Sequence, residues 1–540
     1  MRTLELTLSP EEYYNEELLR EAAARGMRVG VGEVSHVEVV RRSLDSRRGI
    51  RYRCQAEVYM VGEEFVEKDY RSEYKYVGGM VAPAVPDGKS KDDDIYRVVI
   101  VGAGPAGLFA ALHALELGMK PIIVERGKAV EERKKDITAL VRNGHVDGDS
   151  NWCFGEGGAG TYSDGKLYTR STKRGDVSAV LRKFVEHGAD PKIMIDAHAH
   201  IGTDRLSPII ANMRKTITEH GGEIHFGCRV ADLIVDGEMN VHGVRLADGS
   251  AVEGDAVVLA TGHSARDIYE LFFRKGWLLE AKPFAMGVRV EHPQELINEI
   301  QYHGKGYSPL LPPAAYSLTT QVYSSIQAFK HSSIQHGVFS FCMCPGGVIV
   351  PAATGDGEQV VNGMSNASRS SAYANSGIAV TVGVEDVPEY AQYGPLALLR
   401  FQQDVERRVF EASGGSLRAP GQRLTDFCEG RSTGRLNRSN YMGEFVHGEL
   451  DGMLPGFVCD CLRQGFRDFG RKMKGFYTSQ ASLLAVESRT SSPVRIPRDS
   501  KSMEHPQLHG LYPCGEGAGY AGGIVSSALD GIRVIDNLKH

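Results

Sequence analysis

The segment Arg97–Gly107 joins a short apolar run to three closely spaced glycines. The run Val98–Val101 has the composition of a buried strand, and the glycines that follow have the spacing G-x-G-x-x-G. In this pattern Gly102 permits a tight turn, Gly104 lets the backbone approach a pyrophosphate, and Gly107 lets the next helix pack against the strand. The N-terminus of that helix offers unpaired N–H groups to an anion. The segment therefore predicts a strand, turn and helix that bind a dinucleotide.

The residues after this turn support the same prediction. A second apolar run, Pro121–Val124, predicts a strand, and Glu125 ends it at the distance expected of an acid that accepts hydrogen bonds from ribose hydroxyls. The glycine spacing alone is weak evidence, because the chain has 63 glycines. The alternative is a glycine turn without a ligand, and the flanking strand and acid favour the binding site over it.

Size and composition indicate a globular protein of several domains. A chain of 540 residues is longer than one hydrophobic core usually supports, so we expect two or three domains. The formal net charge of -6 gives no general attraction to nucleic acids or anionic membranes. No apolar window reaches membrane-spanning length, and the first residues contain no signal-peptide core. We therefore expect a cytoplasmic protein that does not bind membranes.

Nine cysteines are too few for a disulfide scaffold in a chain of this length, and their odd number fits reduced thiols. Two C-x-C pairs occur, Cys342 with Cys344 and Cys459 with Cys461. A four-cysteine zinc site built from both pairs is an alternative, but C-x-C is not the usual zinc spacing. We therefore expect no metal site.

The N-terminal residues predict a small α+β unit. The sequence from Ser9 to Glu12 offers an N-cap, a proline at the first helical position and a capping-box acid, so we expect a helix from there to about Gly26. Two β-rich runs follow, Val37–Leu44 and Ile50–Met60. A Pro- and Gly-containing segment with a charged tail then predicts a linker.

The order of later segments distinguishes FAD from NAD. Ile224–Val230 predicts a parallel strand, Val241–Val252 a hairpin and Ala256–Gly262 a buried strand that ends in a small-residue turn. Near the C-terminus, Leu508–Glu516 predicts another strand, and a glycine-rich loop leads into a final helix. A β-meander after the first dinucleotide-binding half, followed by such a strand, indicates FAD.

Four further blocks carry a family resemblance: Phe154–Leu167, Cys342–Gly347, Glu487–Arg495 and Gly515–Ile524. With them the chain resembles the glutathione-reductase-like FAD superfamily, and more closely the bacterial family of uncharacterised FAD-dependent dehydrogenases, also labelled NAD(FAD)-utilising dehydrogenases. The resemblance implies an α/β protein: a Rossmann-type FAD-binding domain with an inserted α+β substrate domain, preceded by a small ferredoxin-like α+β domain. The expected boundaries are 1–76 for the ferredoxin-like domain, 77–94 for the linker, 95–275 and 479–540 for the two parts of the FAD-binding domain, and 276–478 for the inserted domain.

The resemblance also implies contacts to FAD. The first glycine turn would hold the pyrophosphate, Val230 would meet the adenine through its backbone, and Glu516 would lie at the ribityl phosphate, where most of the superfamily has aspartate. The candidate FAD-binding residues are Gly102, Gly104, Pro105, Ala106, Gly107, Glu125, Arg126, Gly158, Ala159, Gly160, Val230, Thr261, Gly262, Gly515, Glu516, Gly523 and Ile524.

The segment Gly155–Gly160 repeats the G-x-G-x-x-G spacing, and a second nucleotide site is one interpretation of it. Residues Asp149–Cys153 before it are polar and turn-like, so we favour a glycine loop that lies against the flavin or its phosphates. Without a second Rossmann unit, NAD(P)H would visit the non-covalently bound FAD transiently, or another donor would reduce it.

Five side chains are candidates for catalysis, each with a structural alternative. Lys166 either orients a substrate or is solvated, and His263 is either an acid or base or a satisfied polar residue at a strand end. Cys344, with Cys342, forms either a thiol site near the flavin or a pair of unreactive buried thiols. Arg489 and Arg495 either clamp an anionic substrate or hold two domains together.

An arginine cluster in the first domain raises the question of nucleic-acid binding. Its members are Arg41, Arg42, Arg47, Arg48, Arg51 and Arg53, with Asp45 as the one nearby acid. An RNA-binding face is one interpretation, but the aromatic pattern of an RNA-recognition motif is missing, and a solvated basic face or an interdomain contact is favoured.

The leading functional hypothesis is an FAD-dependent oxidoreductase of the dehydrogenase type. It would transfer a hydride or an electron pair through flavin N5 between a small organic substrate and a nicotinamide or other acceptor. The alternatives are an FAD protein that modifies tRNA and a flavin-binding regulatory protein without turnover. The sequence names neither the substrate nor the oligomeric state.

Overall fold

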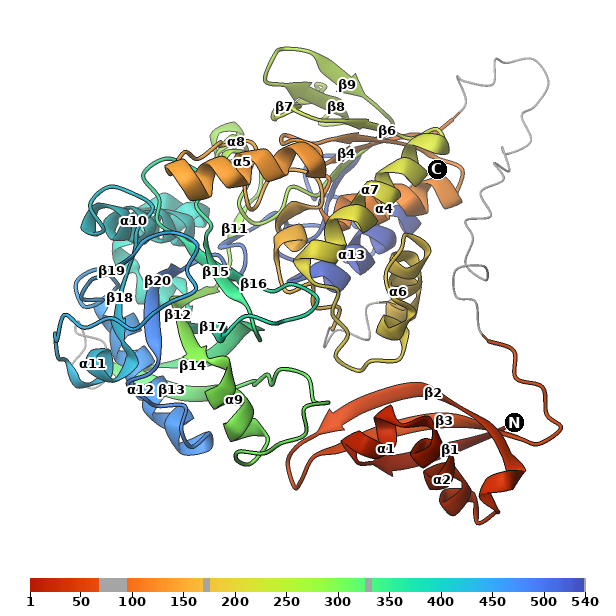
Figure 1. Cartoon of the computed structure of the whole chain (residues 1–540). Coiled ribbons are helices and arrows are strands. Elements are labelled where there is room, and N and C mark those ends of the chain that lie inside the picture. The colour runs from red at the N-terminus through yellow and green to blue at the C-terminus, as the bar shows by residue number, and fades with distance from the viewer. Residues whose placement is uncertain (68–94, 169–174, 326–332, 539–540) are drawn as a thin grey trace, which may run out of the picture.

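The computed structural model describes residues 1–67, 95–168, 175–325 and 333–538. Three parts can be distinguished: an N-terminal domain, a dinucleotide-binding domain and a domain built on a larger sheet, with the latter two side by side above the first in the view of Figure 1. The expected linker 77–94 lies outside the described residues, as do positions 68–76 of the expected first domain.

The N-terminal domain is a three-stranded antiparallel sheet with two helices on it. Its elements are β1 (Arg2–Leu8), α1 (Pro10–Tyr14), α2 (Glu16–Met27), β2 (Val34–Asp45) and β3 (Arg51–Met60). The capping box at Ser9 and Glu12 is present. The single helix expected up to Gly26 is wrong: it breaks at Asn15, whose side chain accepts hydrogen bonds from the first turn of α2 and so begins a new helix.

The strand order of this domain is β1-β3-β2, and its described elements form a β-α-β-β unit. These correspond to the first four of the six elements of the β-α-β-β-α-β ferredoxin-like pattern, so the ferredoxin-like assignment stays a prediction. The edge strand β2 also pairs with the next domain, since Arg42 N donates to Ile195 O at 2.8 Å and Ala197 N donates to Arg42 O at 3.0 Å. The domain is therefore fixed to its neighbour by backbone hydrogen bonds.

The dinucleotide-binding domain has a five-stranded parallel sheet in the order β22-β10-β4-β5-β6. These strands are β4 (Arg97–Val101), β5 (Lys120–Val124), β6 (Glu223–His225), β10 (Ala256–Leu259) and β22 (Leu511–Pro513). In β4, Val98 and Ile100 pack into one core, and Val99 and Val101 pack into another on the opposite face. Covering on both faces explains the uninterrupted apolar run of this central strand.

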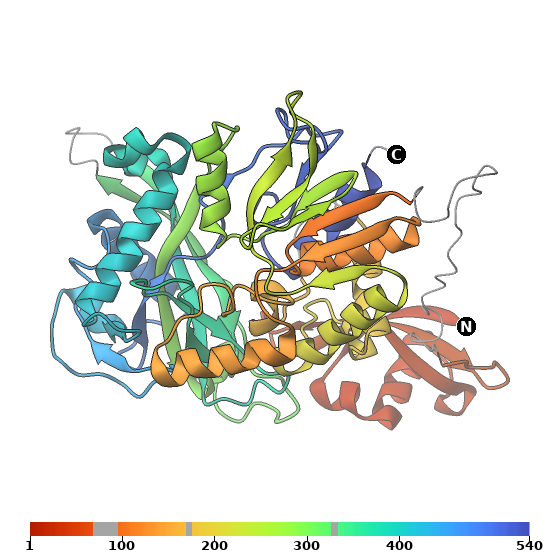
Figure 2. The same cartoon turned by 90° about the horizontal axis from the view of Figure 1, so that it is seen from above.

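Helices cover one face of this sheet, and a small antiparallel sheet with one helix covers the other (Figures 1 and 2). On the first face lie α4 (Pro105–Glu116), α6 (Val177–Glu186), α7 (Thr203–Glu219) and α13 (Ile524–Asp536). A Cβ on Gly531 of α13 would lie 2.2 Å from the carbonyl oxygen of Ala106, so α13 and α4 are in close backbone contact. On the other face lie β7 (Val230–Val235), β8 (Val241–Leu246), β9 (Ala251–Glu253) and α8 (Arg266–Lys275). Helix α5 (Val130–Asn143) lies at the edge facing the third domain.

The strand expected over Ile224–Val230 is divided in two. Its first residues form β6, and Gly227 then takes a φ of 68°, which turns the chain away from the parallel sheet. Val230 begins β7, which pairs with β8 in the separate sheet. Glycine accepts this left-handed conformation at little cost, which explains the break at this position.

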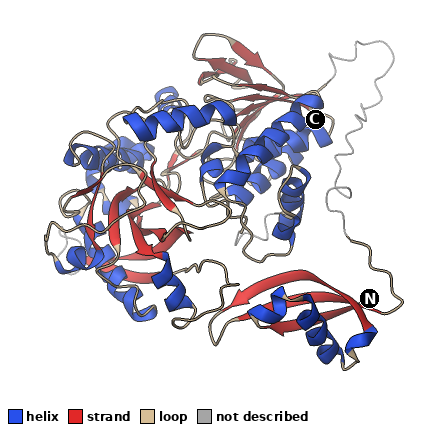
Figure 3. Ribbon diagram, in the orientation of Figure 1, coloured by secondary structure: helices blue, strands red, loops and turns tan. Residues whose placement is uncertain are grey.

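The third domain is built on a mixed seven-stranded sheet in the order β13-β14-β17-β12-β20-β18-β19 (Figure 3). Its strands are β12 (Phe284–Pro293), β13 (Thr319–Ser325), β14 (Ser333–Cys344), β17 (Tyr373–Val382), β18 (Ala419–Arg423), β19 (Phe445–His447) and β20 (Ser482–Glu487). Beside it lie the β15 (Val348–Pro351) and β16 (Val361–Met364) pair and the helices α9 (Gln294–Gln301), α10 (Ala397–Ala412), α11 (Leu424–Glu429) and α12 (Gly456–Lys472).

The larger sheet extends past position 479, where we expected the FAD-binding domain to resume. Strand β20 pairs with β12 and β18, so the chain leaves this sheet only after Glu487. The short strands β11 (Glu280–Ala281) and β21 (Val494–Arg495) then pair with each other where the chain enters and leaves the insertion. None of the helices within the described ranges combines the length and the apolar character that a bilayer crossing requires.

Candidate functional site

A cavity of about 990 Å³ lies at the carboxyl ends of the parallel strands and reaches the larger sheet. This volume is at the upper end of the range, about 300–1,000 Å³, typical of small-molecule and cofactor sites. The residues that directly follow β4, β5 and β10 line it, which is where open α/β sheets bind their ligands. Ser317–Thr319 and Phe339–Cys342, from the third domain, complete its wall.

The cavity brings together most of the predicted cofactor residues. Every candidate FAD-binding residue lines it except Gly107 and Gly515, which lie against the lining residues Gly102 and Ala106. Of the catalytic candidates, Lys166, His263 and Arg489 line it, whereas Arg495 and Cys344 do not.

The first glycine turn is shaped by close backbone contacts. Gly102 has a φ of 107°, and a Cβ there would lie 2.5 Å from Ala260 O. A Cβ on Gly107 would lie 1.9 Å from Gly102 O, so this position holds α4 directly against the turn. Helix α4 begins at Pro105, and its N-cap residue, Gly104, offers no side chain to the first N–H groups. An anion in the cavity would therefore find unpaired donors at this helix end.

Glu125 connects three backbone segments of the cavity wall. Its Oε2 accepts a hydrogen bond from Ala103 N at 2.7 Å, and its Oε1 accepts bonds from Gly127 N and Gly155 N, each at 2.9 Å. A carboxylate offers about four acceptor positions, so these three bonds leave one of them, on Oε2, for a ligand hydroxyl. The acid predicted from its spacing therefore also organises the loops around it.

The second glycine loop has no strand before it, and part of it forms a short 3-10 helix over Gly158–Tyr162. It lies against the first loop, since Gly157 N donates to Ala103 O at 2.8 Å and a Cβ on Gly158 would lie 3.1 Å from Gly104 Cα. The two glycine segments therefore form neighbouring walls of one cavity and not two separate nucleotide sites.

Arg133, on α5, holds the second loop in place and was not singled out from the sequence. Its side chain is fully buried and donates to four carbonyl oxygens, those of Asn151, Gly155, Glu156 and Gly158, at 2.8–3.3 Å. Glu156 is also fully buried, and burial raises its pKa to about 7. Its Oε2 accepts from Val130 N at 2.8 Å and pairs with Arg214 at 2.9 Å.

The ends of β10 and β22 add polar groups to the cavity. The Thr261 hydroxyl is buried and has no hydrogen-bonding partner within the described ranges. Glu516 lines the cavity, and burial raises its pKa to about 7. Gly515, just before it, is fixed by its N–H, which donates to Asp530 Oδ2 at 2.7 Å. Buried polar groups without partners are rare and mark places where a ligand supplies the missing hydrogen bond.

Lys166 and the first C-x-C pair meet at one end of the cavity. The Lys166 ammonium donates to the carbonyl oxygen of Met343, the residue between the two cysteines, so this lysine is not simply solvated. Cys342 faces the cavity, whereas Cys344 is fully buried behind it. Within the described ranges no group of three or more His, Cys, Asp or Glu residues is arranged to hold a metal ion.

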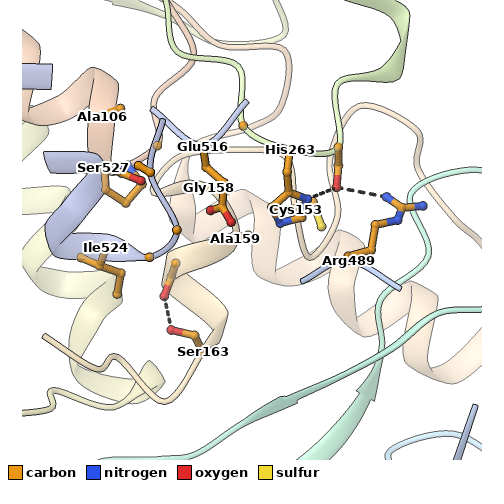
Figure 4. Close-up of a pocket in the computed structure, with 18 of the residues that line it drawn as sticks. Ala106, Cys153, Gly158, Ala159, Ser163, His263, Arg489, Glu516, Ile524 and Ser527 are labelled. Carbon is orange, nitrogen blue, oxygen red and sulfur yellow. Dashed lines mark hydrogen bonds between the residues drawn. The ribbon is translucent and has the colours of Figure 1, made fainter. Parts of the chain in front are cut away.

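His263 belongs to a hydrogen-bonded row with Ser264 and Arg489 (Figure 4). Its Nδ1 lies 2.9 Å from the Ser264 hydroxyl, which accepts from Arg489 Nη1 at 3.0 Å. Burial, followed by the charges of Arg489 and Arg266, lowers the pKa of His263 to about 4. The ring is therefore neutral at pH 7, and it faces the cavity.

Arg489 connects the two larger domains. It bonds to both carboxylate oxygens of Glu406 on α10 at 2.9 Å and to Glu358 at 2.7 Å, and Arg266 on α8 bonds to the same two acids. Arg495 lies outside the cavity, 3.5 Å from Glu280. Arg489 thus makes contacts between the two domains and also lines the cavity, whereas Arg495 only pairs at the junction between β11 and β21.

The arginine cluster of the N-terminal domain is partly used for internal contacts. Arg42 pairs with Asp196 of the next domain, with Nη2 and Oδ2 2.9 Å apart, and Arg47 and Arg53 both pair with Asp45. Arg42 therefore makes the interdomain contact that was favoured over RNA binding.

Several lining residues carried no usable sequence signal. Ser317–Thr319 and Phe339–Phe341 lie in segments without a motif, and they reach the cavity only because the larger sheet packs there. Ser526 and Ser527 also line it, and their place two and three residues after Ile524, in the first turn of α13, could have revealed them.

Matches to protein families cover most of the chain. Residues 97–134 match the FAD binding domain, residues 166–283 match flavin containing amine oxidoreductase, and residues 283–490 match FAD-dependent protein, C-terminal domain-like. Residues 1–59 match a domain of unknown function.

Among solved structures, the open conformation of a flavocytochrome c3 fumarate reductase aligns at 12% identity over 83% of this chain and 80% of its own, with a TM-score of 0.33. CtdE in complex with FAD aligns at 13% identity over 81% and 82%, with a TM-score of 0.29. Scores this low support no conclusion about fold or chemistry.

An uncharacterised protein of Clostridium beijerinckii is 37% identical over 544 residues, which cover 100% of this chain and 98% of that protein. Similarity over the full length of both proteins includes the N-terminal domain, both glycine loops and the insertion. The chain therefore belongs to the same family as this clostridial protein, and it is an FAD-dependent oxidoreductase.

Proposed function

We propose that this oxidoreductase is of the dehydrogenase type and transfers a hydride or an electron pair between a small organic substrate and a nicotinamide or other acceptor. One observation carries the proposal: a single cavity joins the glycine turn to the face of the larger sheet. A cofactor bound along this cavity would have its dinucleotide part on the parallel sheet and its flavin beside the inserted domain, which would bind the substrate. This is a glutathione-reductase-like arrangement.

The side chains and backbone of the cavity fit FAD. The absence of a Cβ at Gly104 and the open first turn of α4 suit the pyrophosphate. The remaining acceptor position of Glu125 suits a hydroxyl of the adenosine ribose, and the unpaired Thr261 hydroxyl suits a phosphate or hydroxyl farther along. Glu516 suits the hydroxyls of the ribityl chain, because a carboxyl with a pKa near 7 both donates and accepts hydrogen bonds.

At the flavin end, this chain orients the reactants and excludes water. FAD supplies the atom, N5, that accepts or donates the hydride. Phe339–Phe341 would cover the reacting face, and the Lys166 ammonium would place positive charge at that end of the cavity. His263 is uncharged at neutral pH, so it would serve as a hydrogen-bond donor or acceptor and not as a cation.

A nicotinamide dinucleotide would bind at this site transiently and would not be a permanently bound cofactor. Within the described ranges two glycine segments join a parallel strand to a helix N-terminus, the turn after β4 and the loop between β22 and α13, and both line this one cavity. A nicotinamide dinucleotide would therefore approach the flavin from the side of the larger sheet and leave after transferring its hydride.

The test begins with the visible spectrum of the purified protein and with release of FAD on denaturation, which we expect because the cofactor would be bound non-covalently. Anaerobic mixing with NADH and, separately, NADPH should then bleach the flavin absorbance. If dithionite bleaches the flavin and neither nicotinamide does, the nicotinamide part of the proposal is wrong, and a panel of small organic donors tests the remainder.

A further inference from the structure

The two cysteines at the end of β14 differ sharply in their surroundings. Cys342 lines the cavity and Cys344 is fully buried, with their sulfur atoms 4.0 Å apart. The pairing of β14 with β17 shifts between Phe341 and Cys344, and Cys342 has a φ of 42°. Non-glycine residues are rarely held in this conformation, and where they are, the site is commonly functional. The two sulfurs therefore lie close together at an irregular end of the strand.

Two basic side chains fix the backbone around this pair. The Lys166 ammonium donates to Met343 O, and Arg289 Nη2 donates to Cys342 O at 2.9 Å. Arg289 is itself fully buried, with its Nε 3.2 Å from Glu487 Oε2. The hydrogen bond with Cys344 and the charges of Lys166 and Arg289 lower the pKa of Cys342, whereas the same hydrogen bond and burial raise the pKa of Cys344. A pair with one thiolate and one protonated thiol suits thiol–disulfide chemistry.

The same end of the cavity is the one at which we place the flavin ring. A Cβ on Gly160 would lie 3.1 Å from Ile524 Cγ1, so the second glycine loop and the start of α13 meet there. Six residues after Gly160, Lys166 contacts the backbone of the cysteine pair. Gly160, Ile524, Lys166 and Cys342 all line the same cavity, so a flavin ring beside Gly160 and Ile524 would share that cavity with Cys342.

We propose that Cys342 and Cys344 form a redox-active dithiol that exchanges two electrons with the flavin. The inference rests on the proposed placement of FAD in the cavity. In the direction of dithiol oxidation, the Cys342 thiolate and the Cys344 thiol lose two electrons and one proton and one S–S bond forms, while FAD takes up two electrons, that proton and one proton from solvent to become FADH2. The sulfurs must approach from 4.0 Å to the bonding distance of about 2.05 Å, which needs a rotation of Cys342 toward Cys344.

An anaerobic dithionite titration of the holoenzyme, purified in air, measures how many electrons the protein takes up per FAD. A flavin alone takes up two electrons, and a flavin with a disulfide takes up four, so wild type should consume about twice as much dithionite per FAD as Cys342→Ser or Cys344→Ser. Cys461→Ser is the matched control, because it removes a buried thiol from the other C-x-C pair and should titrate like wild type. Dithionite replaces the nicotinamide, so the result does not depend on which donor the enzyme uses.

A second measurement uses the wild-type protein alone and detects the disulfide by thiol labelling. Wild type purified in air is denatured and treated with iodoacetamide before and after reduction, and the labelled peptides are identified by mass spectrometry. Cys342 and Cys344 should become labelled only after reduction, whereas the other seven of the nine cysteines are labelled in both samples. Full bleaching of wild type by a single two-electron equivalent, equal consumption in wild type and both serine variants, or labelling of Cys342 and Cys344 without reduction would each overturn the proposal.

Discussion

The two glycine loops have the same spacing and different structural support. Gly102–Gly107 is formed by the strand before it and the helix after it, and its glycines also contact each other, since a Cβ on Gly107 would lie 1.9 Å from Gly102 O. Gly155–Gly160 follows a turn, and its shape depends on the side chains of Arg133 and Glu125, which come from elsewhere in the domain. Both loops bring backbone close to the cavity. The G-x-G-x-x-G spacing therefore indicates that the backbone comes close to a ligand. It does not indicate whether a strand and a helix flank the loop.

The largest expected effect comes from removing the support of the second loop. In Arg133→Met the four carbonyl oxygens lose a buried donor, at about 1–3 kcal/mol for each acceptor left unpaired, so we expect a loss above about 4 kcal/mol. FAD content after purification and urea denaturation measure the effect. The control is Arg142→Met, an exposed position on the same helix. If the Arg133 variant retains FAD and its stability, the second loop does not depend on this side chain.

A side chain in the Gly102–Gly107 loop should weaken FAD binding through steric overlap. In Gly107→Ala the new Cβ would lie 1.9 Å from Gly102 O, so α4 must move away from the turn, at a cost of about 2–3 kcal/mol. We expect weaker FAD binding, measured by fluorescence titration of the apo-protein. Gly32→Ala, where nothing lies within 4 Å of the added atom, should bind FAD like wild type. Equal affinities in both variants would show that the turn tolerates the shift.

Glu125 joins the two loops, so its replacement should affect both moderately. In Glu125→Gln the side-chain amide cannot accept all three backbone hydrogen bonds, and we expect a loss of about 1–2 kcal/mol with roughly tenfold weaker FAD binding. Thermal unfolding and FAD titration measure the two effects. Glu132→Gln, an exposed residue on α5, serves as the control. Unchanged binding would mean that ribose recognition does not involve this carboxylate.

The smallest effect concerns pH, and it should distinguish the loops. The second loop contains Glu156, whose folded pKa of about 7 lies above its usual value of 4.5, whereas Gly102–Gly107 contains no titratable group. A raised folded pKa means that this carboxyl stabilises the fold most below pH 4.5 and loses that contribution as the pH rises to about 7. The melting temperature of Glu156→Gln should therefore gain a few degrees on wild type between pH 5 and 8. A constant difference over this range would contradict the assignment.

Sequence patterns predicted correctly those helices, strands and turns whose formation depends on neighbouring residues. The strand, turn and helix over Arg97–Gly107, the capping box at Ser9 and the final helix after Gly523 all follow from neighbouring residues, and the structure contains each of them. The two breaks that we missed, at Asn15 and Gly227, are also local. Each depends on one residue that either continues an element or ends it, and composition alone does not decide between these outcomes.

The missed features of the cavity depend on distant partners. Arg133 looks like an ordinary helix arginine in the sequence, and its four acceptors become visible only when the loop after α5 folds back on it. Lys166 contacts a carbonyl 177 residues away, and β20 joins the larger sheet by pairing with a strand almost 200 residues earlier. A single sequence without its contacts does not contain this information.

The packing of α13 against α4 also sets an order of events during biosynthesis. Gly104 and Ile524 both line the cavity but are 420 positions apart in the chain. At about 5–20 residues per second, a ribosome needs roughly 20 to 80 s to pass from one to the other. Throughout that interval the glycine turn exists without its opposite wall, and its apolar partner surface on α4 is open to water. FAD capture therefore comes only after α13 has been made, and a nascent chain would need protection until then.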